Sequence, residues 1–489
     1  GHTYTLNGTL MDKETGKAFL DKNGNKVTAS TTFTTKTIED GFTDEDKSGS
    51  AQLPFTFEIA GDSFGKKLVA FEDMKEDGHK FAVHADLEDQ EQTIIIPKIG
   101  TEAIGKDSET NLINNSGMQT INDTVKYEGL LAGKSYTMTG YAVDSKTGKE
   151  IEGTKNSVQF STNDEAGSVV VPITIDAAKH AGSDVVIFEE LYYNGKIVAD
   201  HTDLKDSKQT VHISEIKTKA VDKDTKLNVI KKSGTQNIVD TVTYKNLIAG
   251  KTYTGKAWLV DPETGDKIEG TEVTKEFTAE EANGTFDMEL TFTQDENEPL
   301  EKVTVFEEVY LGDKLIGEHK DVTDTNQTLS DIKIKTKAEA EDTKTNETSG
   351  IGKKKIIDTV HVSGLATGDQ YEVRGWLTDS EGKKLEGTDG TQKFEAKAPE
   401  MDVKVELTFD ASKYAGEDVH VFEELYRQNI LIGEHKDTGD EDQVVHVSKV
   451  DTSAVSATWG NTIVPTKGKQ YINDSVTYEN LDTDSTYTL

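Results

Sequence analysis

Val186-Ile187-Phe188-Glu189, followed at 201–209 by His-Thr-Asp-Leu-Lys-Asp-Ser-Lys-Gln, is the stretch that decides the organisation of this chain. Alternation places Val186 and Phe188 on one face of a strand and Glu189 on the other face or at its end. The pattern His-x-Asp-x-x-Asp-x-x-Gln occurs four times, each time after an apolar stretch that ends in Phe-Glu. Its copies run from His84 to Gln92, His201 to Gln209, His319 to Gln327 and His435 to Gln443.

A second landmark, Asp-Thr/Ser-Val, confirms the period of the repeat. It lies at Thr124, Thr241, Thr359 and Ser475, and both landmarks recur at intervals of 117, 118 and 116 residues. Repeats of this length indicate an array of ordinary-sized domains. The predicted modules are 1–98, 99–216, 217–334 and 335–449, with a detached first-strand segment at 450–489. The Lys/Thr/Ala-rich stretches 215–225 and 331–344 lack an apolar period and are predicted to be linkers.

Short alternating segments separated by polar, Gly-containing turns predict an all-β module. Alternation over 123–127 and 136–143 is followed by the turn Asp-Ser-Lys-Thr-Gly-Lys at 144–149, and equivalent hairpins recur at 257–267 and 375–384. Short strands at this spacing are typical of an antiparallel β-sandwich.

Composition excludes several classes of function. The net charge is −36, from 54 Lys and Arg against 90 Asp and Glu, which disfavours nucleic acid and anionic membranes as partners. The chain has no cysteine, so disulfides and thiolate metal sites are excluded. No calcium-loop spacing indicates a metal site, no cofactor is expected, and no stretch is apolar enough for membrane insertion. Without a signal peptide or sorting tail, the chain is expected to be a fragment of a longer extracellular protein.

These motifs resemble the ester-bond domains, or VaFE repeats, of Gram-positive surface adhesins. The resemblance rests on Val186 to Glu189, Asp123-Thr124-Val125 and His201 to Gln209, and it covers essentially the whole chain. It implies tandem Ig-like or CnaB-like sandwiches in a rod, each cross-linked by an autocatalytic Thr–Gln ester. It also implies extracellular localisation, with the full-length parent anchored in the cell wall, and a structural stalk that is not an enzyme.

The resemblance also implies residue roles in three complete modules. His201 would take the proton of Thr124, while Glu189 and Asp206 would share a proton directed at the Gln209 carbonyl; Asp203 is interpreted as a turn residue. The cross-linked pairs would be Thr124 with Gln209, Thr241 with Gln327 and Thr359 with Gln443. The catalytic groups would be Glu189, His201 and Asp206; Glu307, His319 and Asp324; and Glu423, His435 and Asp440.

The two ends of the chain look like parts of one divided module. Tyr4 aligns with Tyr136, so the first module lacks its Thr-bearing strand, whereas a first-strand sequence with Ser475 occurs near the other end. Glu72, His84, Asp89 and Gln92 would then await a nucleophile from elsewhere. We expect Ser475 of one molecule to bond Gln92 of the next, a head-to-tail polymerisation through strand complementation.

Three alternatives stay open. A passive adhesin stalk without cross-links would have the same fold, and one module could bind a ligand. A hydrolase with His, Asp and Thr as a triad is disfavoured because no nucleophile elbow is present. A Lys–Asn isopeptide domain is disfavoured because Lys126 becomes Thr243 and His361 in the next copies. The sequence does not identify a host ligand.

Overall fold

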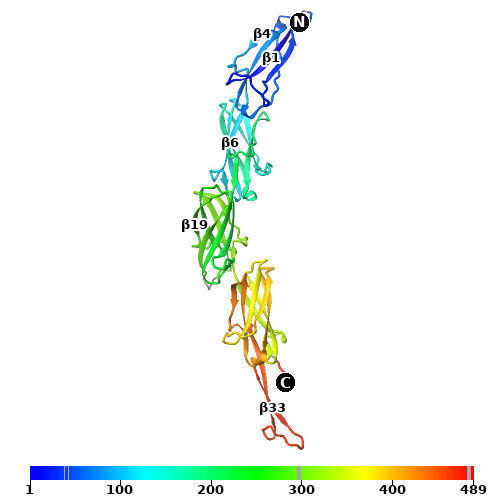
Figure 1. The fold of residues 1–489 in the computed structure, drawn as a ribbon, viewed down its shortest axis with the longest axis vertical. Coiled ribbons are helices and arrows are strands. Elements are labelled where there is room, and N and C mark those ends of the chain that lie inside the picture. The colour runs from blue at the N-terminus through cyan, green and yellow to red at the C-terminus, as the bar shows by residue number, and fades with distance from the viewer. Residues whose placement is uncertain (38, 42, 295–298, 482–485, 489) are drawn as a thin grey trace.

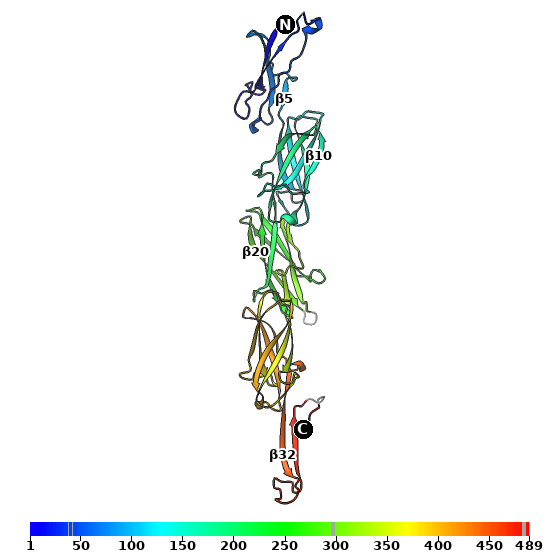
Figure 2. The ribbon, with the colours of Figure 1, turned by 90° about the vertical axis from the view of Figure 1, so that its right-hand side faces the viewer.

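A computed structural model describes residues 1–489 except 38, 42, 295–298, 482–485 and 489. The described residues contain strands and a few short 3-10 turns but no α-helix. Figures 1 and 2 show β modules joined end to end in a rod, with the N-terminus at one end and a protruding hairpin at the other. The predicted fold class, an all-β tandem array, is confirmed.

We number the modules along the chain. Module 2, which corresponds to the predicted range 99–216, is a sandwich of two sheets. One sheet has the strand order β11-β8-β6, and the other has the order β10-β9-β12-β14-β7, with β13 paired to β12. The strands are β6 (Lys98–Gly105), β7 (Leu112–Ile113), β8 (Met118–Glu128), β9 (Ser135–Asp144), β10 (Asn156–Ser161), β11 (Gly167–Asp176), β12 (Asp184–Tyr193), β13 (Lys196–His201) and β14 (Thr210–Ile213).

Modules 3 and 4 repeat this topology. Module 3 contains β15 (Glu215–Asp222), β16 (Val229–Ile230), β17 (Gly234–Lys245), β18 (Thr252–Val260), β19 (Val273–Thr278), β20 (Gly284–Gln294), β21 (Lys302–Leu311), β22 (Lys314–His319) and β23 (Thr328–Asp331). Module 4 contains β24 (Lys333–Ala340), β25 (Glu347–Ser349), β26 (Lys353–Ser363), β27 (Gln370–Thr378), β28 (Gly390–Glu395), β29 (Glu400–Asp410), β30 (Asp418–Arg427), β31 (Ile430–His435) and β32 (Val444–Ser456).

The two ends carry incomplete modules. Module 1 has one sheet, formed by β1 (Thr3–Asp12), β2 (Thr28–Thr34), β3 (Lys67–Glu76), β4 (His79–His84) and β5 (Thr93–Ile95). At the other end, β32 continues beyond module 4 and pairs with β33 (Ile472–Glu479) in an antiparallel hairpin. The predicted detached first strand is therefore a pair of strands, and one of them is continuous with module 4.

The prediction of linkers at 215–225 and 331–344 is wrong. These stretches form most of β15 and β24, which are the first strands of modules 3 and 4. In both strands Thr and Ala share the buried face, including Thr218 with Ala220 and Thr336 with Ala338, and they alternate with more exposed side chains, mostly Lys. The strands begin at Lys98, Glu215 and Lys333, one or two residues before the predicted module starts.

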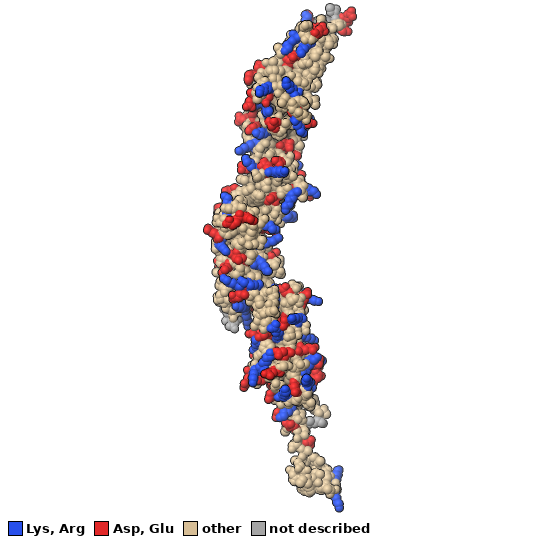
Figure 3. Space-filling model, in the orientation of Figure 1, with Lys and Arg blue, Asp and Glu red and all other residues tan. Residues whose placement is uncertain are grey.

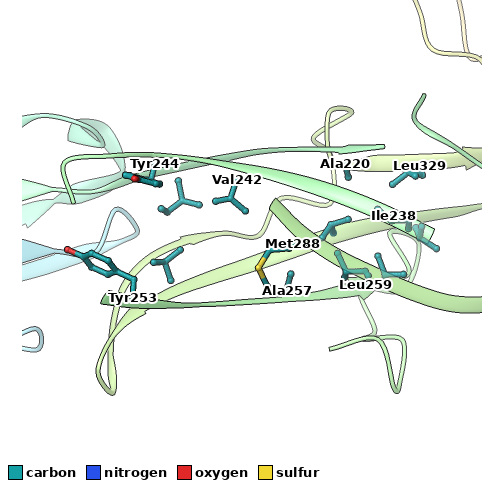
Figure 4. Close-up of a cluster of buried hydrophobic side chains, with 14 of the residues drawn as sticks. Ala220, Ile238, Val242, Tyr244, Tyr253, Ala257, Leu259, Met288 and Leu329 are labelled. Carbon is teal, nitrogen blue, oxygen red and sulfur yellow. The ribbon is translucent and has the colours of Figure 1, made fainter. Parts of the chain in front are cut away.

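Each complete module has its own core between its two sheets. In module 3 the core includes Ile238, Tyr253, Leu259 and Met288, which extend from facing strands toward one another (Figure 4). Equivalent clusters fill modules 2 and 4, whereas the cluster in module 1 has only five buried members. Along β6 and β8 buried and more exposed residues alternate, so every second side chain of these strands points into the interior of module 2.

Acidic and basic side chains are interspersed along the face of the rod shown in Figure 3. Within the described ranges, no helix has the length and apolar character needed to cross a membrane. The same part of the chain contains no cluster of three or more His, Asp or Glu side chains placed to hold a metal ion.

Candidate functional site

The first two strands of each complete module bring a threonine and an aspartate into the interior. On β6, Thr101 is buried in alternation with Ile99 and Ala103. On β8, Asp123 is buried in alternation with Ile121 and Val125. The strand register pairs position 101 with 125 and position 103 with 123, and the Thr101 hydroxyl donates a hydrogen bond to Asp123 Oδ1.

The opposite sheet supplies the remaining groups. Glu189 on β12 faces the interior and pairs in register with His201 at the end of β13. The chain then turns through Asp206 and places Gln209 immediately before β14, where its backbone carbonyl accepts a hydrogen bond from Ile187. Glu189, Asp123 and Gln209 all have 0% exposed surface. The predicted Glu, His, Asp and Gln residues therefore converge from separate elements.

Gln209 and Thr101 are in direct contact across the sandwich. The Gln209 amide nitrogen donates to Thr101 Oγ1 and lies 3.4 Å from Asp123 Oδ1. The same pairs recur in the next two modules: the nitrogen of Gln327 is 2.9 Å from Thr218 Oγ1, and that of Gln443 contacts Thr336 Oγ1. The three amide carbonyl oxygens are buried without a hydrogen-bond partner among the described residues. Each site thus holds a threonine hydroxyl against a glutamine amide whose carbonyl oxygen accepts no hydrogen bond.

A pair of buried carboxyl groups surrounds this contact. Burial, together with the charge of Asp123, raises the pKa of Glu189 to about 11. Burial also raises the pKa of Asp123, although its hydrogen bonds with Glu189 and Thr101 partly oppose the shift. The pKa of Glu307 and that of Glu423 are raised well above the usual range for the same reasons. Glu189 is therefore neutral at pH 7 and can donate a proton, while the adjacent aspartate accepts hydrogen bonds.

The histidine is oriented by the aspartate five residues later. His201 Nε2 lies 2.9 Å from Asp206 Oδ2, and the corresponding distances are 3.1 Å from His319 to Asp324 and 3.2 Å from His435 to Asp440. A carboxylate can only accept, so Nε2 carries a hydrogen in each module. The second ring nitrogen differs between modules: His319 Nδ1 lies 3.2 Å from the backbone carbonyl of Ile216, whereas His435 Nδ1 has no hydrogen-bond partner among the described residues. In module 4, Nδ1 lies on the interior side, 3.9 Å from Glu423 Oε2.

The structure contradicts the predicted nucleophiles Thr124, Thr241 and Thr359. Each lies one residue after the buried aspartate and therefore points to the outer face of its sheet. Thr241 illustrates this, because its Oγ1 donates to the exposed Asp287 carboxylate at 2.7 Å. The threonines that contact glutamine are instead Thr101, Thr218 and Thr336, and the paired residues are 108, 109 and 107 positions apart.

The predicted proton-sharing partner of Glu189 also needs correction. Asp206 binds His201, and the carboxyl group beside Glu189 is Asp123, a residue that sequence reasoning quoted without assigning it a role. A signal for both corrections was present in the sequence. Asp123 is two residues from Val125 and therefore faces the same side of the strand as this apolar residue. Thr101 stands two residues before Ala103, and the same Thr-x-Ala pattern recurs at Thr218, Thr336 and Thr452.

Module 1 and the C-terminal hairpin contain complementary halves of this site. In module 1, His84 Nε2 lies 2.9 Å from Asp89 Oδ2, and the Gln92 amide, oriented to satisfy its donors, is 3.1 Å from Glu72 Oε1. These groups are only partly covered, and 49% of the His84 side chain is exposed.

In the hairpin, β32 pairs Thr452 with Val476 and Ala454 with Asp474. This register is the same as that of Thr218 with Val242 and Ala220 with Asp240 in module 3. In this register Ser475 occupies the position of Thr241, and Thr452 occupies the position of Thr218, the threonine that contacts glutamine in module 3.

Five successive segments, residues 1–96, 97–213, 214–331, 332–447 and 448–489, match the T-Q ester bond containing domain. The chain belongs to this family. Within the matched segments, the Thr–Gln pairs in contact are Thr101 with Gln209, Thr218 with Gln327 and Thr336 with Gln443.

Two solved structures match the chain at low identity and low TM-score. A bacterial adhesin from Mobiluncus mulieris containing intramolecular disulfide, isopeptide and ester bond cross-links is 14% identical, over 55% of this chain and 98% of that one, with a TM-score of 0.23. A tetra-tandem repeat in the extending region of a large adhesion protein is 12% identical over 89% of this chain and 92% of that one, with a TM-score of 0.17. No curated protein matches the chain.

Proposed function

We propose that this chain is part of the stalk of a bacterial surface adhesin, held at the cell wall, in which modules 2, 3 and 4 are each closed by one ester bond. The bonds join Thr101 to Gln209, Thr218 to Gln327 and Thr336 to Gln443. The observation that carries the proposal is the buried contact between hydroxyl and amide, repeated in three modules within the same set of Asp, Glu and His side chains.

The residues of module 2 can carry out the reaction without a cofactor. In this proposal the Thr101 hydroxyl, which donates to Asp123 Oδ1 in the structure, turns to His201 Nδ1 and gives up its proton while Oγ1 attacks the side-chain carbonyl carbon of Gln209. The neutral Glu189 carboxyl donates a hydrogen bond to the oxygen on which negative charge develops. The C–N bond then breaks, the nitrogen takes up the proton originally held by the hydroxyl, and ammonia leaves. This is a single turnover on the protein itself, so the chain is no enzyme toward other substrates.

The position of the bond suits a mechanical role. In module 3, Thr218 is near the start of the first strand and Gln327 lies just before the last strand, β23. An ester between them carries tension directly from the entry of the module to its exit. The hydrogen-bonded ladders over residues 219–326 then bear little load.

Intact mass of the denatured chain tests the proposal. Each ester lowers the mass by about 17 Da through loss of ammonia, so three bonds lower it by about 51 Da. Tryptic peptides that join the two partners of each pair would locate the bonds. The full calculated mass would instead leave a passive β-sandwich stalk.

The half-sites at the two ends support a finer hypothesis of head-to-tail linkage. We propose that the hairpin of one copy completes the open module 1 of another, with Thr452 as nucleophile and Gln92 as acyl donor. Support comes from the shared strand register and from exposed apolar side chains on both parts, such as Phe81 and Ile472. A ladder of denaturation-resistant multimers is expected; T452A abolishes it and S475A preserves it. Monomeric mass at high protein concentration would contradict this hypothesis.

A further inference from the structure

One outer face of module 2 differs from the corresponding faces of modules 3 and 4. Strands β9 and β10 pair Ser135 with Ser161, Thr137 with Gln159 and Thr139 with Ser157. Two of these pairs are joined by hydroxyl hydrogen bonds of 2.8 Å, Ser135 to Ser161 and Thr139 to Ser157. All six side chains are uncharged, and we call them the neutral strip; five are at least partly exposed, whereas Thr139 is buried.

Of the six matching positions, two carry charged side chains in module 3 and four do so in module 4. In module 3 the register places Lys256 beside Thr274 and Thr254 beside Glu276. In module 4 the positions are occupied by Glu372, Arg374, Lys393 and Glu395. The lack of charge on the strip is therefore a property of module 2 and is not imposed by the fold.

A tyrosine borders each of these surfaces, Tyr192 on β12, Tyr310 on β21 and Tyr426 on β30, and its ring is covered differently in each module. Lys256 Nζ lies 4.8 Å from the centroid of the Tyr310 ring, and the Arg374 guanidinium lies 4.0 Å from that of Tyr426. The equivalent of Lys256 and Arg374 in module 2 is Thr139, opposite Glu190 on β12. Within the described residues, no cation lies over the ring of Tyr192.

Tyr192 is held rigidly beside an open hollow. Its hydroxyl donates a 2.6 Å hydrogen bond to Glu190 Oε2, which fixes the plane of the ring. The hollow has a volume of about 480 Å³ and is lined by Tyr192, Gln159 and the hydroxyl groups of the neutral strip, with Asn194 and Gly195 at its edge. Module 2 thus presents an aromatic ring whose face is not capped, surrounded by neutral donors and acceptors.

We propose that this hollow is a binding site for a neutral glycan. A pyranose ring has an apolar C–H face that packs on an aromatic side chain, and its hydroxyl groups both donate and accept hydrogen bonds. Ser, Thr, Gln and Asn side chains can match both roles, and Glu190 adds an acceptor at the rim. An acidic glycan is disfavoured because the strip has no cation and the chain carries a net charge of −36.

Saturation-transfer NMR on the full chain tests the proposal with four neutral hexasaccharides: maltohexaose, laminarihexaose, mannohexaose and chitohexaose. We expect at least one to bind with a Kd of about 1 mM, equivalent to about 4 kcal/mol. Tyr192→Ala should weaken binding roughly fivefold, which corresponds to an aromatic contact of about 1 kcal/mol.

The sharper variant is Thr139→Lys. It places a lysine at the position that Lys256 occupies in module 3, where the ammonium lies over the tyrosine ring, and should cover the Tyr192 ring in the same way. It should abolish the signal. Thr174→Lys, on the exposed face of β11 in the other sheet of module 2, is the matched control and should leave binding unchanged. The proposal is overturned if none of the four sugars binds, if only an acidic sugar such as a hyaluronan hexasaccharide binds, or if binding survives Thr139→Lys.

Discussion

Substituting Thr218 removes the proposed ester of module 3, together with the 3.3 Å hydrogen bond from its hydroxyl to Glu307 Oε1. Thr218→Ala removes the hydroxyl that contacts the Gln327 amide, whereas Thr241→Ala removes the predicted nucleophile, which bonds the exposed Asp287 on the outer face. The two variants delete the same atoms from neighbouring strands that pair with each other. They therefore form a matched pair for identifying which threonine reacts.

The expected loss of stability follows from the length of the closed loop. Thr218 and Gln327 are 109 positions apart, and a cross-link closing a loop of about 100 residues stabilises by roughly 4.7 kcal/mol in the chain-entropy model. With an unfolding entropy of about 2.1 cal/mol/K per residue, a module of this size would lose roughly 15–20 °C of its Tm. Thr241→Ala removes one exposed hydrogen bond and should change the free energy of unfolding by no more than about 0.5 kcal/mol.

Intact mass and scanning calorimetry of the full chain measure both effects. The mass of the parent chain should lie about 51 Da below its calculated value, and that of Thr218→Ala only about 34 Da below its own calculated value. The thermal transition of module 3 should move to lower temperature, while those of modules 2 and 4 stay in place. Thr241→Ala should match the parent in mass and in all transitions. If Thr241→Ala restores the mass and Thr218→Ala does not, the assignment of the nucleophile from the direction of its side chain is refuted.

The remaining predictions concern the groups around the bond. Thr101→Ala keeps module 2 unreacted, so that Glu189 remains free to titrate. The pKa of Glu189 is raised from 4.5 to about 11 in the folded module. Its contribution to stability is therefore fully present below pH 4.5 and is lost as the pH rises toward about 11. The Tm of that module should therefore fall between these pH values and fall less when Glu189→Gln is added; equal slopes in titrated calorimetry would contradict the shift. Asp206→Asn should slow ester formation by roughly tenfold or more, because His201 loses the acceptor that fixes its tautomer. Its mass measured against time after synthesis should reach the same final deficit as the parent, whereas an unchanged rate would remove Asp206 from the reaction.

Much of the organisation could be predicted because repetition exposes it. Four copies of His-x-Asp-x-x-Asp-x-x-Gln identified the module length, and alternating short segments identified the sandwich. The same motif located Glu189, His201 and Gln209, which the structure brings into one buried site. These residues are close in space because β12, β13 and β14 are adjacent in one sheet, so sequence neighbours remain spatial neighbours.

The nucleophile was misplaced because Thr218 and Thr241 lie on adjacent strands of one sheet, and their side chains point to opposite faces of it. Residues 215–225 and 331–344 resemble linkers in composition, yet β15 and β24 bury one face and gain stability from pairing with β17 and β26. Local sequence does not reveal that pairing, because the contact with Gln327 spans 109 positions. Only the register of two strands decided that Thr218 faces inward and Thr241 outward.

The sequence by itself determined the period of the array, the all-β character of its modules and most of the polar residues of the site, since these depend on repetition and on local alternation. The tertiary structure alone decided which threonine contacts glutamine, which carboxyl groups share the buried space, and which tyrosine is left uncovered. The physical reason is that a shift of one residue along a strand moves a side chain to the opposite face, and that face is fixed only when two distant strands pair and bury a common core.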